Sequence, residues 1–306
     1  MSRPASPSAN PFLAEGARIC FSQRAVLRAS ALLVAILGCV LVLWWPRGPV
    51  ASSLQPLAGP RTLTVVSVSL LAALAWLSAR LGAEDHASSS FISMEGYVGL
   101  VAGDDARLRC RAVATVIRGK LAFGLVHTIF LLALGSPFVL AAVGVSGASF
   151  TTGLCILLVA GAAATGFRML GLFLLTALPG HALVRDMVML VAGAAGLAAC
   201  TALLPAASPL SALLALAAAV DPPAVGWIPG PALPFYLVSV IMSLLVAVLF
   251  AAGASASLSA ATKARNGTRD GSARSGAPEK NARSGAPEKD ARSGAPEKDA
   301  RSGAQV

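Results

Sequence analysis

The sequence predicts an all-α integral membrane protein with about six transmembrane helices, both ends in the cytoplasm and a disordered C-terminal tail. Of its 306 residues, 56% are hydrophobic and only 12% are charged, whereas an ordinary soluble domain is roughly a quarter charged. The charges also leave long gaps, with no Asp, Glu, Lys or Arg between Lys120 and Arg168 or from Met187 to Val220. Finally, the basic residues gather on alternate connections between the apolar segments.

Residues 1–28 are expected to form a cytoplasmic leader. Within it, residues 10–27 mix apolar side chains such as Phe12 and Phe21 with charged ones such as Arg18. A helix that lies in the membrane interface uses such a mixture, so we expect an interfacial amphipathic helix here. A solvated leader with a few stray apolar residues is the alternative.

The transmembrane domain is predicted to span residues 29–260. A helix needs about 20 mainly apolar residues to cross the hydrocarbon layer, and helices are expected because each backbone polar group must be satisfied without water. Six segments come near this length: residues 29–45, 62–79, 121–143, 150–178, 187–204 and 235–256.

The third and fourth segments are divided by a predicted turn at residues 144–147, which read Gly-Val-Ser-Gly. The fourth is long and contains Arg168. Because long basic side chains near a helix end can reach the membrane surface, we expect Arg168 to snorkel to the cytoplasmic interface.

Residues 205–234 are predicted to form an outer excursion between the fifth and sixth spans. The apolar run 208–220 has only 13 residues, which are too few to cross a bilayer. It is followed by Asp221-Pro222-Pro223 and further prolines. We therefore expect a re-entrant or interfacial segment.

Charge sets the predicted orientation. The leader, the loop 80–120 and the tail carry nearly all the Lys and Arg residues, whereas the opposite connections hold only Arg47 and Arg61. Positive residues stay on the cytoplasmic side, so both ends are predicted to lie there, in a multi-pass protein of the plasma membrane, most simply a bacterial cytoplasmic membrane. The net charge of +10 is then explained by topology, and no nucleic-acid partner is expected.

The cytoplasmic loop 80–120 is much longer than two neighbouring helices require, and loops longer than about 15 residues are usually functional or disordered. Residues 90–101 are fairly apolar, and residues 107–120 alternate basic and apolar side chains at roughly helical spacing. Two short helices that dock a cytoplasmic partner would explain both pieces. An interfacial loop without a partner is the alternative.

The tail, residues 261–306, repeats the sequence RSGAPEK with a period of nine residues. Ser, Gly, Ala and Pro supply no buried face, while Glu and Lys remain solvated, so the tail is expected to be disordered. We assign it no chemistry.

The sequence offers little sign of chemistry within this chain. It contains no GxxxxGK[ST], HExxH or GxSxG motif, and its five cysteines lack the close spacing of a metal or redox site. His127 lies well inside a span without an acidic partner, and an interhelical hydrogen bond is expected there rather than a ligand or proton carrier. No catalytic, cofactor-binding or metal-binding residue is therefore predicted, and the chain is not expected to be an enzyme.

Several short motifs resemble those of one family. Asn10-Pro11 with Glu15, Ile92-Ser93 with Glu95, Gly119-Lys120 at the start of the third span, and the Gly-Val-Ser turn at 144–146 occur in the expected order. Together with the order of spans and loops, they resemble the membrane subunit of type-2 ABC transporters. The Gly-Thr-Leu and Thr-Pro elements usual in that family's coupling region are absent.

The resemblance implies a permease that moves a substrate across the membrane, driven by a separate cytoplasmic ATP-binding subunit, so that ATP is expected on the partner and no cofactor on this chain. Two permease chains, identical or different, would line one pathway in the bilayer. A non-transporting membrane scaffold or assembly factor is the alternative. The resemblance also places an ATPase-coupling surface in the loop 80–120, comprising Glu95, Arg107, Arg109, Arg111, Arg118, Gly119 and Lys120.

Overall fold

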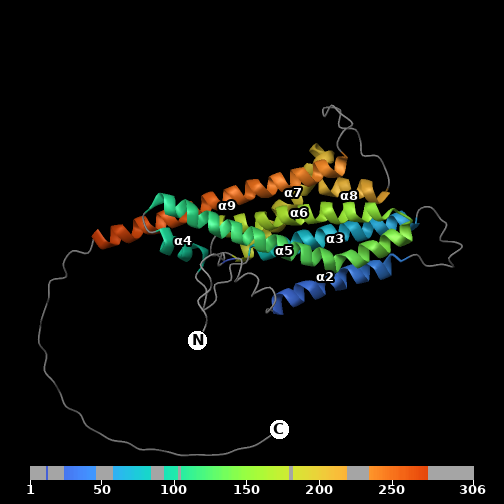
Figure 1. Cartoon of the computed structure of the whole chain (residues 1–306), viewed down its shortest axis with the longest axis horizontal. Helices are drawn as coiled ribbons and strands as arrows, with labels where there is room; N and C mark the ends of the chain where they lie inside the picture. Colours follow the sequence, from blue (N-terminus) through green and yellow to red (C-terminus); the bar gives the residue numbers. More distant parts are fainter. Residues whose placement is uncertain are drawn as a thin grey trace, which may run out of the picture. The chain divides into compact units, whose positions relative to one another are not determined.

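The computed structural model describes residue 12 and residues 24–45, 58–83, 93–102, 105–178, 182–218 and 234–274. In this part of the chain every regular element is helical (Figure 1): α2 (Arg24–Leu43), α3 (Ala58–Gly82), α4 (Met94–Ala102), α5 (Ala106–Ser146), α6 (Phe150–Ala177), α7 (Ala182–Leu203), the 3₁₀ turn η1 (Pro205–Ala207), α8 (Pro209–Ala218) and α9 (Phe235–Arg274). The arrangement described below belongs to the unit Met1–Gly267; the second unit is Thr268–Val306.

The helical membrane class predicted from the sequence is confirmed. Five helices are long and apolar enough to cross a bilayer, namely α3, α5, α6, α7 and α9. The first predicted span corresponds to α2, whose apolar part, Leu27–Leu43, is shorter than these five. By length and composition, the described residues therefore hold five candidate spans, with α2 as a shorter apolar helix beside them.

The turn between the third and fourth predicted spans begins at the last residue of the predicted turn 144–147, because residues 144–146 still belong to the helix. Helix α5 ends at Ser146, and Gly147 follows with φ 70°, a left-handed conformation that glycine adopts without steric cost. Ser149 then caps α6, accepting a hydrogen bond from the backbone N–H of Thr152 at 3.2 Å. Helices α5 and α6 thus form an antiparallel hairpin.

Three predicted boundaries need correction. The basic segment 107–120 is not a separate short helix: it is the beginning of α5, which continues unbroken into the third span for 41 residues, or about 60 Å. Good helix formers such as Arg, Leu and Ala in that segment explain the continuity.

The last span was expected to end near residue 256 and the tail to begin at 261, but α9 continues to Arg274. The repeats beyond it, and most of the predicted leader helix at 10–27, lie outside the described residues.

The helices are packed around α3 and α6. One apolar core joins α3 and α6 with parts of α2, α5 and α8, and includes the fully buried Leu37, Leu70, Leu131, Ile156 and Leu213. By contrast, α7 and α9 are mostly uncovered. Of the apolar 18-residue stretch of α7 only 11% is buried, and of that of α9 only 17%, against 67% for α6. The side chains of α7 and α9 are therefore largely left for lipid or for another chain.

Helix α7 does not extend as far as α6 at the end of the bundle where α6 begins. A Cβ atom at Gly193 would lie 3.1 Å from the Phe167 ring, so these residues are level, and Leu203 lies about 15 Å further along α7. From Phe167 back to Phe150, α6 covers about 26 Å. The 10-residue helix α8 packs on α3 and α6 in this region. It is too short to cross a bilayer, and the side of the membrane on which it lies stays a prediction.

Candidate functional site: the α4–α5 surface and the buried Arg168

Helix α4 and the first turns of α5 form a small helical hairpin. Ser93 caps α4 through its hydroxyl, which accepts from the Gly96 N–H at 3.2 Å. Asp105 caps α5, accepting from the Arg107 N–H at 2.7 Å. An acidic side chain at a helix N-terminus also interacts favourably with the helix dipole. These caps fix where the two helices begin and hence which side chains the hairpin presents.

Apolar contacts hold the hairpin to the membrane-spanning helices. The buried face of α4, including Met94 and Val98, belongs to the same cluster as Val113 and Val116 of α5. That cluster continues into α6 through Met169 and Leu172, and into α9 through Ala254 and Leu258. The ring of Phe12 packs edge-on against Tyr97 of α4, with ring centroids 5.0 Å apart. A force on the hairpin would therefore act directly on α5, α6 and α9.

The structure divides the seven residues predicted to form the coupling surface. Arg107, Arg111 and Arg118 are exposed and, at spacings of four and seven residues, share one face of α5. Arg109 and Lys120 fall on another face and are half-buried, as is Glu95 on α4. Gly119 is buried, so it adds nothing to the exposed surface of the hairpin, and its place in a coupling surface stays a prediction. The run of basic residues looks continuous in sequence, but helical rotation of 100° per residue separates its members.

Three exposed apolar side chains lie at the end of α4 and in the first turn of α5, close in sequence to the arginines. Leu100 and Val101 at the end of α4 are 73% and 44% exposed, and Leu108 in the first turn of α5 is 41% exposed. Together with Arg107 and Arg111, these three residues define the coupling patch. Sequence reasoning included the arginines but missed the leucines and valine, whose positions at the ends of the two helices could have indicated them.

A second site lies deeper in the bundle. Arg168 on α6 is only 4% exposed, so the expectation that it snorkels to the surface was wrong. Its Nη1 lies 3.3 Å from Nδ1 of His127 on α5, and its Cζ lies 5.1 Å from the centroid of the Phe123 ring. Because a guanidinium only donates hydrogen bonds, Nδ1 of His127 is the acceptor. The expected interhelical hydrogen bond of His127 is therefore confirmed, with a partner that sequence reasoning did not identify.

Glycines make room for this arginine. A Cβ atom at Gly124 would lie 2.6 Å from both Cδ and Nε of Arg168. On the other side, a Cβ at Gly82 of α3 would overlap the backbone carbonyl of Arg168. The arginine is thus enclosed by α3, α5 and α6, near the C-terminal end of α3. Cation–π contact and hydrogen bonding offset part of the cost of burying its charge.

No part of the described structure brings together three or more His, Cys, Asp or Glu side chains in a way that could hold a metal ion. The guanidinium of Arg168 and the imidazole of His127 offer positioning and charge at this site. No protein-family model, curated protein or solved structure matches the chain.

Proposed function

We propose that the chain is the membrane subunit of a transporter, driven by a separate ATP-binding subunit that docks on the coupling patch. The supporting observation is that three of the five patch residues, Arg107, Leu108 and Arg111, lie on α5, a continuous helix that runs from this end into the apolar bundle. Arg111 is 16 residues from His127, or about 24 Å along a single helix. A displacement at the patch would therefore reach the interior without crossing a flexible loop.

The charge and shape of the coupling patch define the partner. Its exposed apolar side chains suit an apolar groove, and Arg107 and Arg111 suit acidic residues at the rim of that groove, because complementary charge orients an encounter. The described chain leaves the apolar faces of α7 and α9 largely uncovered. A second permease chain, identical or different, would cover part of them and complete a pathway. In this proposal both termini and the patch are cytoplasmic.

Purification of the full-length chain from its native membrane in mild detergent tests the proposal. We expect a co-purified subunit with a Walker motif and ATP hydrolysis by the complex. Leu100→Asp and the double variant R107Q/R111Q should each lower the recovered ATPase activity at least tenfold, since they alter the centre and the charge of the contact. Arg61→Gln, an exposed arginine on α3, is the matched control and should leave recovery unchanged.

The alternative is a membrane scaffold that uses the same patch to recruit a partner without nucleotide chemistry. The exposed Leu100 and Arg107 would serve such a partner equally well. The two functions give different results: a patch-dependent partner that neither carries a Walker motif nor hydrolyses ATP would support the scaffold and overturn the transporter.

A further inference from the structure

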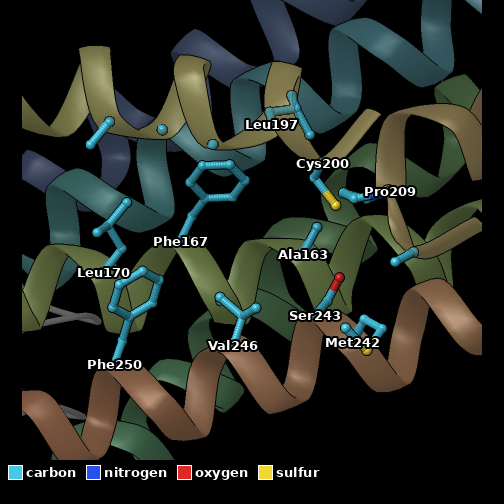
Figure 2. Close-up of a pocket in the computed structure, with 15 residues that line it drawn as sticks. Ala163, Phe167, Leu170, Leu197, Cys200, Pro209, Met242, Ser243, Val246 and Phe250 are labelled. Atoms are coloured by element: carbon cyan, nitrogen blue, oxygen red, sulfur yellow. The ribbon is translucent and has the colours of Figure 1, made fainter. Parts of the chain in front are cut away.

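A cavity of about 250 Å³ lies between α6, α7 and α9. Figure 2 shows Leu197 and Cys200 of α7 on one side of it and Val246 of α9 on the other, with Ala163 of α6 between them. Of the residues that line it, none is charged, and only Ser243 carries a hydroxyl group. A ligand held here must be almost wholly apolar, because it finds almost no hydrogen-bond partners in the walls.

The cavity is a slot that runs along the helices. On α7 its lining extends from Ala192 to Cys200, and on α9 from Met242 to Phe250, each about 12 Å of helix. One end is closed by Ala207 and Pro209, where α7 turns through η1 into α8.

This closed end is fixed by hydrogen bonds. Thr201 and Ser208 hydroxyls lie 2.7 Å apart, and the Thr201 hydroxyl also donates to the Leu197 carbonyl at 2.7 Å. The slot therefore has a firm closed end inside the bundle and runs toward the other end of α7.

Small residues make room for the slot between the helices. Gly166 and Ala163 form its floor on α6, while Gly193 and Gly196 open its α7 wall. A Cβ at Gly196 would meet no atom within 4 Å, so the space beside it is empty of protein. A slender chain fits this geometry better than a helix from a second copy, whose side chains would need a broad, shallow groove.

A positive charge lies beyond the open end on the same helix face. Arg185 precedes Ala192 by seven residues and Gly196 by eleven, spacings that keep all three on one side of α7. Arg185 therefore lies about 10 Å from Ala192 along the helix axis, toward the N-terminal end of α7. Its Nε atom is buried and has no hydrogen-bond partner in the described part of the chain.

We propose that this slot binds one acyl chain of a phospholipid, with its methyl end against Pro209 and its phosphate on Arg185. The apolar slot and the cation at Arg185 match the two parts of such a molecule in their order and spacing. The phospholipid comes from the leaflet at the Arg185 end, which the proposed topology makes the cytoplasmic one. The inference does not depend on the ATPase partner.

The test uses the full-length protein in nanodiscs and a phosphatidylglycerol probe with a photoactivatable diazirine in one acyl chain. Adducts mapped by mass spectrometry are expected on Leu197, Val246 and Phe250 at least fivefold more often than on Val191 and Val248, which are exposed on α7 and α9. Equal labelling of the two sets would show only ordinary surrounding lipid and would overturn the proposal. Slot residues labelled less than Val191 and Val248, as expected if a second copy of the chain filled the slot, would also overturn it.

Filling the slot supplies the matched variants. Gly196→Leu and Gly196→Phe should reduce slot labelling progressively, to the level at Val191. Gly144→Phe is the control, because Gly144 is also an exposed helical glycine with open space around it but lies on α5, outside the slot. Equal slot labelling in the Gly196→Phe and Gly144→Phe proteins would contradict the proposal.

The role of Arg185 has its own comparison. A diacylglycerol probe with the same diazirine chain but no phosphate should label the wild-type slot about fivefold less than the phosphatidylglycerol probe, the effect of one basic residue on an anionic lipid. In Arg185→Gln the two probes should label equally, and in Arg61→Gln the preference should persist. A phosphate preference that survives Arg185→Gln would remove Arg185 from the site.

Discussion

Replacement of Gly171 by alanine tests the close packing of α3 and α6 on which the bundle depends. A methyl group at this position would overlap the carbonyl oxygen of Ala79 and would lie 2.9 Å from its carbonyl carbon and 3.0 Å from the backbone nitrogen of Ala83. These are backbone atoms of α3 and of the residue that follows it, and they cannot rotate away as a side chain can. The helices must therefore separate along part of a contact that includes buried Leu70 and Leu74.

The expected cost of Gly171→Ala follows from overpacking, which destabilises by about 1–3 kcal/mol. Because the clash is with backbone, we expect the upper end, about 3 kcal/mol, and a fall in Tm of roughly 6–12 °C for a domain of this size. The assay is thermal unfolding of the purified full-length protein in detergent, followed by size-exclusion chromatography of the heated samples.

Two glycines provide controls for the same substitution. A Cβ atom at Gly144 or at Gly196 would have no neighbour within 4 Å, and alanine is favoured over glycine inside a helix by about 1 kcal/mol. Gly144→Ala and Gly196→Ala should therefore leave Tm unchanged or raise it slightly. If Gly171→Ala proved as stable as these controls, the close contact of α3 and α6 would be wrong.

Three further substitutions probe the interior. Gly124→Ala would bring a methyl group within 2.6 Å of Cδ and Nε of Arg168; we expect about 1–3 kcal/mol of destabilisation, and a Gly124→Ala/Arg168→Ala protein should lose less than the sum of the single changes. His127→Leu removes the hydrogen-bond acceptor for Arg168 and should lower the free energy of unfolding by about 1–3 kcal/mol. If the losses from His127→Leu and Arg168→Ala were additive in a double-mutant cycle, the two side chains would not interact. Leu213→Ala in α8, where the side chain is fully buried, should cost about 2–5 kcal/mol; a wild-type Tm would mean that α8 does not pack in the core.

The apolar segments and the turns between them could be predicted for two reasons. A helix needs about 20 residues to cross the hydrocarbon layer, and its backbone hydrogen bonds must be made within the helix because no water is present. The turn at Gly147 and the start of α6 at Phe150 were placed correctly for these reasons. The continuity of α5 was missed because residues 107–120, although read as helical, were assigned to a short helix within the cytoplasmic loop and separated from the span that begins at 121; nothing in the sequence breaks the helix there.

The meeting of Arg168 with His127 was partly readable in the sequence. His127 lies 20 residues before Gly147, and Arg168 lies 21 residues after it, so the two must be level in an antiparallel hairpin. Whether they face each other depends on the rotation of each helix, which is set by tertiary contacts such as those at Gly82 and Gly124. Local pattern does not contain that information.

The proposed coupling patch must lie on the side of the membrane where ATP is available, and Cys110 reports this directly. It is exposed and lies between Arg109 and Arg111 on α5. In a protein that keeps Cys110 and has its other four cysteines replaced, a membrane-impermeant maleimide should label inside-out vesicles and leave intact cells unlabelled. Labelling of Cys110 in intact cells would place the patch outside the cell and contradict its role as the docking surface for an ATPase.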